Sequence, residues 1–189
     1  SGYYGKTVNE WKELLRKYKL NCRAMTVDYA ALNDNPEQLI ADARTLGAKY
    51  IGVGWIPHSN FSIETVREAA GRFNRFGKLC KEKGIRFYYH PHGYEFSVYN
   101  GETLMDEMMR LCDNRYVTFE IDFFWFQYAG ENPARWLKKY PKRFELAHLK
   151  ELRTDVSGTP YGTAPDETSV ALGKGITHWP SLLQAAVAN

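Results

Sequence analysis

The chain has 189 residues, of which 44% are hydrophobic and 25% are charged, a composition typical of a folded globular domain with its own core. A net charge of +3 is too small to indicate a nucleic-acid-binding surface, so we expect no nucleic-acid partner. No apolar run reaches the length of a membrane-spanning helix, and we expect no membrane partner.

The cysteines Cys22, Cys80 and Cys112 lack the spacing of a metal site, and three thiols cannot all pair within one chain. Buried small side chains in a reducing compartment are the simpler interpretation, which favours a cytoplasmic location. Because the chain begins at Ser1 rather than at a methionine, removal of a leader and a periplasmic location stay open.

Hydrophobic periodicity and turn residues predict alternating helices and strands. A helix at 7–18 precedes a strand at 22–27. The next helix begins near Asp34, has Pro36 in its first turn and ends at Gly47, which suits a left-handed cap. The later elements are a strand at 50–56, a helix at 63–83, a strand at 85–90, a helix at 102–111, a strand at 116–122, a helix at 133–139, a strand at 143–149, a long loop at 154–175 and a helix at 179–187.

The strands are continuous apolar runs, the pattern of strands buried on both faces of a parallel sheet. Polar side chains follow their ends: His58, then His90, then Asp122, then His148. In a (β/α) barrel the site is built from such strand ends, whereas a doubly wound sheet usually needs a glycine-rich first turn, which is absent here. The sequence therefore predicts an α/β fold, a parallel barrel, formed by residues 1–189 as a single domain.

A cluster of ionisable side chains follows the strand at 85–90. His90 and His92 are two residues apart on an extended segment and so point to the same side, and Glu95 follows closely. Such a cluster is costly to bury without a task, although a hydrogen-bonded structural histidine pair is the alternative.

The next two strand ends carry Glu120 and Asp122 on one face, then His148 and Lys150 on one face. A helix cap or a partner for an arginine is the alternative for Asp122. Together, His90, Asp122 and His148 could meet one divalent cation, and their donor atoms suit Mn, Co, Zn or Fe better than Ca. Lys150 would then stabilise developing negative charge, unless it is a solvated charge at the rim.

Other side chains are candidates for substrate binding. Trp55 and Trp125 lie at strand ends and could form the walls of a sugar pocket, with core packing as the alternative. His58 could contact substrate or lie on the surface, and Arg153 could bind an anion.

Several segments resemble the xylose-isomerase-like sugar (phosphate) isomerase/epimerase barrels. They are GYYGK at 2–6, LGAKY at 46–50, WIP at 55–57, YHPHGYEF at 89–96, EIDFFW at 120–125, YPKRF at 140–144, HLKE at 148–151 and LGKGITHW at 172–179. The resemblance runs over nearly the whole chain, and the middle segments in this order are specific.

The resemblance implies a (β/α)₈ TIM barrel that holds one divalent cation (Mn, Co, Zn or Mg). Its usual ligands are a Glu or His, then Asp, His and Glu, from the ends of the fifth to the eighth strands. By position, His90, Asp122 and His148 take the first three places. Glu95 is either the fifth-strand ligand or a base, and His92 and Lys150 are the other expected catalytic groups.

The chain departs from this pattern, because only five strands are clear and residues 1–4 form at most the stub of another. The first and last strand units, and with the last the fourth ligand, are not found. A piece of a longer protein, a homo-oligomer or second chain that completes the barrel, and a different closure all stay open. Met25–Val27 also stand where relatives often place a His, and Glu151 stands where many have Asp.

The leading functional hypothesis is a metal-dependent sugar isomerase or epimerase that transfers a proton next to a carbonyl through a metal-stabilised enediolate. A keto-sugar or keto-glycoside lyase or hydratase using the same site is the alternative within enzymes. A catalytically inactive binding barrel is the alternative outside them. In each case the expected partner is a small-molecule sugar or sugar derivative.

Overall fold

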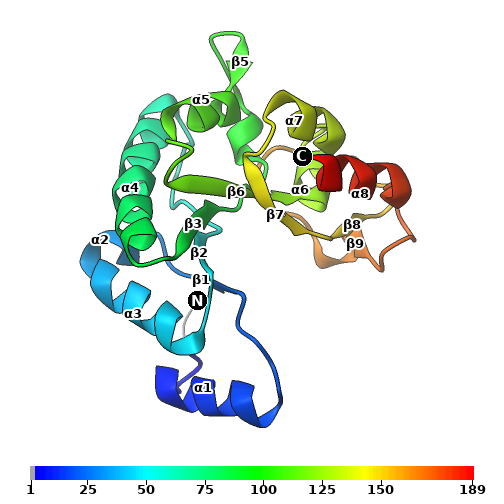
Figure 1. Cartoon of the computed structure of the whole chain (residues 1–189). Coiled ribbons are helices and arrows are strands. Elements are labelled where there is room, and N and C mark those ends of the chain that lie inside the picture. Colours follow the sequence, from blue (N-terminus) through cyan, green and yellow to red (C-terminus); the bar gives the residue numbers. More distant parts are fainter. Residues whose placement is uncertain (1–2) are drawn as a thin grey trace.

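The computed structural model describes residues 3–189, and its centre is a curved parallel sheet of five strands (Figure 1). Each strand pairs in parallel with its neighbours in the sheet. In order across the sheet, the strands are β1 (Ala24–Thr26), β2 (Tyr50–Val53), β3 (Arg86–Tyr89), β6 (Val117–Asp122) and β7 (Phe144–His148).

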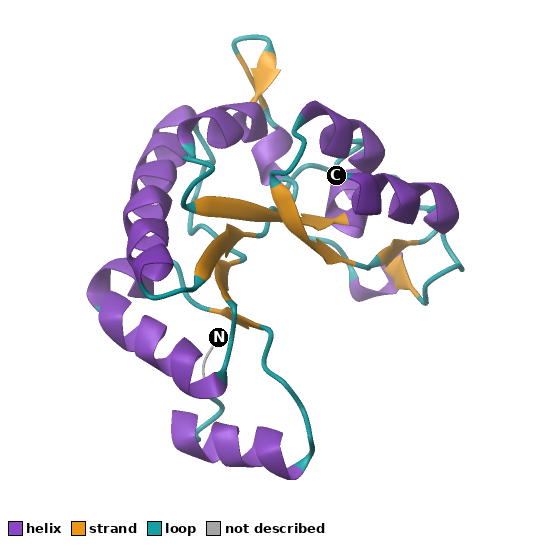
Figure 2. Ribbon diagram, in the orientation of Figure 1, coloured by secondary structure: helices purple, strands orange, loops and turns teal. Residues whose placement is uncertain are grey.

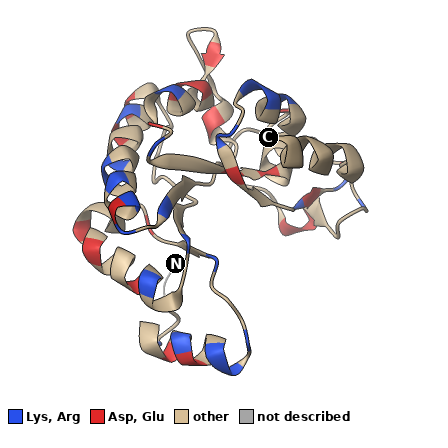
Figure 3. Cartoon of the chain, in the orientation of Figure 1, with Lys and Arg blue, Asp and Glu red and all other residues tan. Residues whose placement is uncertain are grey.

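Helices surround the outer, convex side of this sheet, while the strands line the inside (Figure 2). They are α1 (Val8–Lys17), α2 (Ala31–Asp34), α3 (Pro36–Leu46), α4 (Ile63–Glu82), α5 (Leu104–Leu111), α6 (Phe123–Tyr128), α7 (Pro133–Lys139) and α8 (Trp179–Ala188). Lys/Arg and Asp/Glu residues are both found on α1, α3, α4 and α5, whereas α8 carries neither (Figure 3). No helix within residues 3–189 is long and apolar enough to cross a lipid bilayer.

The parallel architecture confirms the predicted (β/α) barrel type, but the sheet is open. Among residues 3–189, no strand pairs with the outer edge of β1 or of β7. Ala147 and His148, at the end of β7, are consequently exposed. The strand stub predicted at 1–4 lies partly outside the described residues, and Tyr3 and Tyr4 do not belong to a strand.

Local signals explain where the helices begin and end. Thr7 and Glu10 form a reciprocal capping box at the start of α1. Gly47 ends α3 in the left-handed conformation (φ 77°), as the sequence predicted. The helix predicted from residue 102 begins instead at Leu104, because Thr103 caps it and also pairs in the small hairpin of β4 (Val98–Tyr99) with β5 (Glu102–Thr103).

The core fills the space between sheet and helices and also the inside of the curve. On the outside, Phe73 of α4 packs on Phe87 of β3, with ring centroids 5.0 Å apart. On the inside, the Tyr88 ring lies over Gly52, where a Cβ would come within 2.2 Å of it. The Tyr88 hydroxyl reaches Thr26 Oγ1 of β1 at 3.0 Å, so one tyrosine spans three neighbouring strands. The absence of a side chain at Gly52 makes this inner layer possible.

Two features near the strand ends differ from the sequence prediction. The strand expected to reach Ile56 ends at Val53, and the Ile56 amide instead donates to the Tyr94 hydroxyl at 3.1 Å. After β6, helix α6 begins at once, because the Asp122 side chain accepts a hydrogen bond from the Trp125 amide. The chain then pairs β8 (Glu151–Leu152) with β9 (Ser169–Val170) in an antiparallel ribbon.

Candidate metal centre

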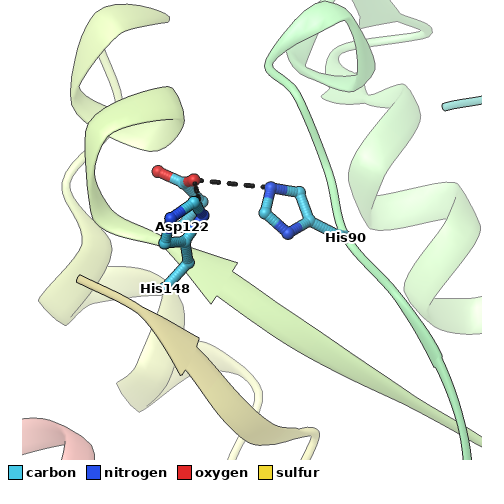
Figure 4. Close-up of side chains that lie close together, drawn as sticks. All are labelled: His90, Asp122 and His148. Carbon is cyan, nitrogen blue, oxygen red and sulfur yellow. Dashed lines mark ion pairs between the residues drawn. The ribbon is translucent and has the colours of Figure 1, made fainter. Parts of the chain in front are cut away.

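Three predicted ligands meet at the carboxyl ends of neighbouring strands (Figure 4). His90 follows β3, while Asp122 and His148 are the last residues of β6 and β7. The β6–β7 register pairs Asp122 directly with His148. One nitrogen or oxygen atom from each of the three side chains lies within 4.8 Å of the others. The predicted convergence on one rim of the sheet is therefore found.

Asp122 uses its two oxygens for different purposes. Oδ1 accepts the Trp125 amide at 3.0 Å and caps α6, while Oδ2 lies 2.7 Å from His148 Nδ1 and 3.4 Å from His90 Nε2. The carboxylate is fully buried. The helix cap and the ligand, alternatives in the sequence, are thus compatible roles of one side chain, because the cap fixes the rotamer that aims Oδ2 at the histidines.

The ionisable groups of the cluster shift one another's pKa values. Burial by itself would raise the pKa of Asp122, but the close polar contacts with His148 and His90 and their charge outweigh it and hold the pKa well below its usual range. Burial would lower the pKa of His90, yet Asp122 and Glu120 outweigh it and raise the pKa to about 9. A cation bound here would compete with that proton, since a histidine ligand must be deprotonated.

The donor set fits a divalent cation. Among the described residues, His90 Nε2 and Asp122 Oδ2 are buried and have no hydrogen-bond partner. Buried polar atoms are almost always paired, so two such atoms facing each other indicate a shared third partner. Imidazole nitrogens with a carboxylate oxygen are ligands that Zn, Mn, Co and Fe accept. His90, Asp122 and His148 are therefore the residues that would hold such an ion.

His92 lies beside this cluster but takes no part in it. Its ring packs against those of Trp125 and Trp55, with centroids 5.2 and 5.9 Å away, and its Nδ1 lies 3.2 Å from the His90 carbonyl oxygen. Burial and the nearby His90 lower the pKa of His92 to about 4, so it is neutral at pH 7. With Nδ1–H donating to the carbonyl, Nε2 carries the lone pair.

Lys150 lies on an aromatic surface next to the cluster. Its Nζ is 3.9 Å from the Phe124 ring centroid and 4.7 Å from that of Trp125. These are cation–π distances, which keep a charged ammonium at a partly dry position. Trp125 therefore contacts both Lys150 and His92 and connects two of the predicted catalytic groups.

Glu95 is not part of the cluster. It is fully buried and accepts hydrogen bonds from the Tyr89 hydroxyl, from the Gly93 amide at 2.8 Å and from the His92 amide at 3.2 Å. Burial raises the pKa of Glu95 against the opposing effect of these hydrogen bonds. Both oxygens are engaged, so the structure does not place Glu95 as a ligand of the cluster. It instead fixes the loop that carries His92.

The expected substrate-binding residues divide into two groups. Trp55 is 42% exposed and stacks on His58, with centroids 5.3 Å apart, so this pair and Trp125 form an aromatic wall beside His92. The His58 ring is oriented by its Nδ1, 2.7 Å from the Ile56 carbonyl oxygen. Arg153 makes other contacts: it pairs with Asp155 at 2.6 Å and donates to the Glu167 carbonyl oxygen of the long loop.

The loop predicted at 154–175, which we call the strap, packs against the rim that carries the cluster. A Cβ at Gly158 would lie 1.8 Å from the Tyr128 carbonyl oxygen of α6, and one at Gly162 would lie 3.2 Å from the Trp55 ring. Glu151 anchors the far end of the strap by accepting the Gly173 and Thr177 amides, each at 3.0 Å. Glu151 is thus a structural acid in this chain.

Sequence reasoning did not assign a role to Glu120. Its Oε2 lies 2.6 Å from His90 Nδ1, on the side of the ring opposite Asp122. Its placement two residues before Asp122 on the same strand face was visible in the sequence. The partner was not, because it depends on the β3–β6 register, which pairs Tyr89 with Phe119 and so sets His90 beside Glu120.

Half of the chain is similar to proteins named inosose dehydratase. The protein from Clostridium beijerinckii is 33% identical over 96 residues, 51% of this chain and 32% of the relative. The one from Clostridium tetani is 34% identical over 96 residues, again 51% of this chain and 32% of the relative. The matched region thus covers about a third of these relatives.

Solved structures share the fold over most of this chain. A sugar phosphate isomerase/epimerase from Parabacteroides distasonis superposes with a TM-score of 0.79 at 18% identity, covering 99% of this chain and 72% of that one. The IolI protein with a bound zinc atom superposes with a TM-score of 0.72 at 16% identity, covering 98% and 69%. The sequence itself matches a family model over residues 1–188. The chain therefore belongs to the xylose isomerase-like TIM barrel family.

Proposed function

We propose that this chain belongs to an enzyme that moves a proton at a carbon next to the carbonyl of a sugar or related polyhydroxylated ketone, with the help of one divalent cation. The observation that carries the proposal is the convergence of His90, Asp122 and His148, with two buried atoms that lack a hydrogen-bond partner among the described residues. A divalent cation bound there would polarise the substrate carbonyl and so acidify the adjacent C–H bond.

His92 is the side chain best placed to accept that proton. It is neutral at pH 7 because its pKa is lowered, and the contact of Nδ1 with the His90 carbonyl leaves Nε2 as the basic atom. Gly54 places no side chain against the His92 ring, whereas a Cβ at that position would contact its Cε1 at 3.4 Å. Glu95, the alternative base, is already engaged by donors on both oxygens and serves to position His92.

Lys150 and the aromatic wall would bind the rest of the substrate. The ammonium lies over the Phe124 and Trp125 rings and can donate to a substrate oxygen that gains negative charge as the proton leaves. Trp55 and Trp125 flank His92 and offer apolar faces on which the C–H face of a sugar ring can pack.

Three outcomes can follow the same proton abstraction. Return of the proton to a neighbouring carbon gives isomerisation, and return to the opposite face gives epimerisation. Loss of a hydroxyl group from the next carbon gives dehydration. Dehydration is the second candidate function, because half of the chain is similar to inosose dehydratases. A ring ketone such as an inosose is the matching substrate class.

Substrate exchange in D₂O tests the proposal. The chain, loaded with Mn²⁺ or Zn²⁺, is incubated separately with an inosose and with a free ketose, and the products are followed by NMR and mass spectrometry. Isomerisation or epimerisation puts deuterium on carbon without changing the composition, whereas dehydration removes one water and gives an absorbing enone. Asp122→Asn is expected to abolish either signal, and His178→Ala, at an exposed residue paired with Ser181, is the matched control. A chain that binds the cation but exchanges no substrate proton is a binding barrel, and the proposal is then wrong.

A further inference from the structure

The contact between Glu120 and His90 has no role in the proton transfer described above, although it is short and specific. Glu120 Oε2 lies 2.6 Å from His90 Nδ1, and the two side chains are 20% and 12% exposed. The fold itself brings the two side chains together. The β3–β6 register sets His90 next to Glu120, and the pleat of β6 turns Glu120 and Asp122 to the same face.

The contact decides which nitrogen of His90 faces the cluster. A carboxylate accepts a hydrogen bond only from a protonated nitrogen, so Glu120 holds the proton of a neutral imidazole on Nδ1. Nε2 then presents its lone pair to the side of the ring where Asp122 Oδ2 lies, 3.4 Å away. With the opposite tautomer, the ring would place an N–H where a cation must bind.

Glu120 also completes the charge balance of the site. The ligand set of His90, Asp122 and His148 contains a single carboxylate, whereas a divalent cation carries two positive charges. Glu120 is outside that set, but its hydrogen bond to the imidazole would increase the negative charge on the nitrogen that faces the ion. A carboxylate behind a metal-binding histidine raises the basicity of the ligand and fixes its orientation.

We propose that Glu120 is a positioning residue that sets the tautomer and strengthens the ligand character of His90. This inference rests on the cation site of the proposed function but concerns only how that site is held. The ligand is a divalent cation of the Zn²⁺ or Mn²⁺ class, and Glu120 itself does not touch it.

Substitutions at residue 120 separate charge from orientation. Gln can still accept the Nδ1–H through its amide oxygen but carries no charge, whereas Ala removes both contributions. We expect the Zn²⁺ affinity of the whole chain, measured by competition with a chromophoric chelator, to fall in the order parent, Glu120→Gln, Glu120→Ala. The loss in the Ala variant should be about 10–100-fold, the usual effect of removing such a partner.

Glu145→Gln is the matched control. Glu145 is a glutamate of the neighbouring strand β7, paired with Arg86 Nη2 at 2.8 Å near the amino-terminal ends of the strands. We expect this variant to keep the parent Zn²⁺ affinity. Where Glu120→Ala fails to fold, Glu120→Gln, which keeps the shape of the side chain, carries the test.

The ¹⁵N spectrum of the His90 ring in the Zn²⁺-loaded parent gives a readout that stability alone would not change. It should show a proton on Nδ1 and the metal on Nε2. A proton-free Nδ1, or a Glu120→Ala variant that binds Zn²⁺ as tightly as the parent, overturns the proposal. If the Zn²⁺ affinities follow the expected order but the chain turns over no sugar, only the proposed function is wrong. If Asp122→Asn binds Zn²⁺ as tightly as the parent, the cation does not bind at this cluster, and both proposals are wrong.

Discussion

Asp122 Oδ2 and His148 Nδ1 lie 2.7 Å apart across paired strands, yet the geometry is that of an ion pair without an aligned hydrogen bond, and Oδ2 has no hydrogen-bond partner among the described residues. Oδ2 thus faces both His148 Nδ1 and His90 Nε2 (3.4 Å away) without an aligned hydrogen bond to either. The other oxygen of Asp122 is fixed by the Trp125 amide, so the carboxylate cannot turn to improve the contact. The start of α6 therefore holds the ligand in place.

Substitution of Asp122 should separate its two roles. Asp122→Asn keeps an oxygen for the Trp125 amide, and with it the helix cap, but loses the charge, so we expect at least a tenfold loss of Zn²⁺ affinity, about 1.4 kcal/mol. Asp122→Ala should lose the affinity and, relative to Asp122→Asn, about 1 kcal/mol more stability because the helix cap is missing. Chelator competition and urea denaturation measure the two effects. Equal stability of the Asn and Ala variants would contradict the capping role.

Glu95 should behave as a structural residue. Replacement by Ala leaves the buried Gly93 amide without its acceptor, which costs about 1–3 kcal/mol, and also removes the acceptor of the partly buried His92 amide. We expect a large loss of unfolding free energy in urea for Glu95→Ala. A Glu95→Ala variant with parent stability and no substrate exchange would instead identify Glu95 as the base and displace His92 from that role.

The loss of folding stability at low pH should depend on Asp106. Burial would raise its pKa, but hydrogen bonds from Lys139 (Nζ 2.6 Å from Oδ1), Tyr140 and Thr103 outweigh it, and the pKa is lowered. Because the folded-state pKa lies below the unfolded one, the stabilisation is complete above the unfolded value of about 3.9 and is lost as the pH falls through the folded value.

We therefore expect Asp106→Asn to lower Tm at pH 7 and to flatten the fall of Tm below about pH 4, the range in which a paired Asp loses its charge. Calorimetry at several pH values measures both effects. Asp113→Asn is a useful comparison, since Asp113 pairs at the surface with Arg115 and its loss should change Tm little. Parallel pH curves for the parent and Asp106→Asn would refute the assignment.

The packing of the strap against α6 should depend on Gly158. A Cβ there would lie 1.8 Å from the Tyr128 carbonyl oxygen, so Gly158→Ala must push the strap away from α6, at a cost of about 1–3 kcal/mol. We expect faster proteolytic cleavage within residues 154–164 and a lower Tm.

Gly71→Ala is the control, because its Cβ would meet only Arg75 Nη1 at 3.5 Å and the site is inside α4, where alanine is favoured by about 0.5–1 kcal/mol. Unchanged cleavage in Gly158→Ala would show that the strap is not held at this point.

The sequence by itself determined the alternation of helices and strands, the parallel sheet, and the strand ends that carry His90, Asp122 and His148. Each of these depends on neighbours along the chain: apolar runs define the buried strands, and capping residues such as Gly47 end the helices. Because parallel strands end on one rim, polar residues directly after them were expected to converge.

Only the tertiary structure decided which partner each of these side chains has. Glu95 is close to His92 in sequence, yet its oxygens face backbone amides and Tyr89, while Glu120, 30 residues after His90, is the acid that touches that ring. Periodicity fixes the face on which a side chain lies within its own strand. The register between strands, the rotamer set by a cap and the packing of a distant loop fix what it meets, and these depend on contacts between segments far apart along the chain.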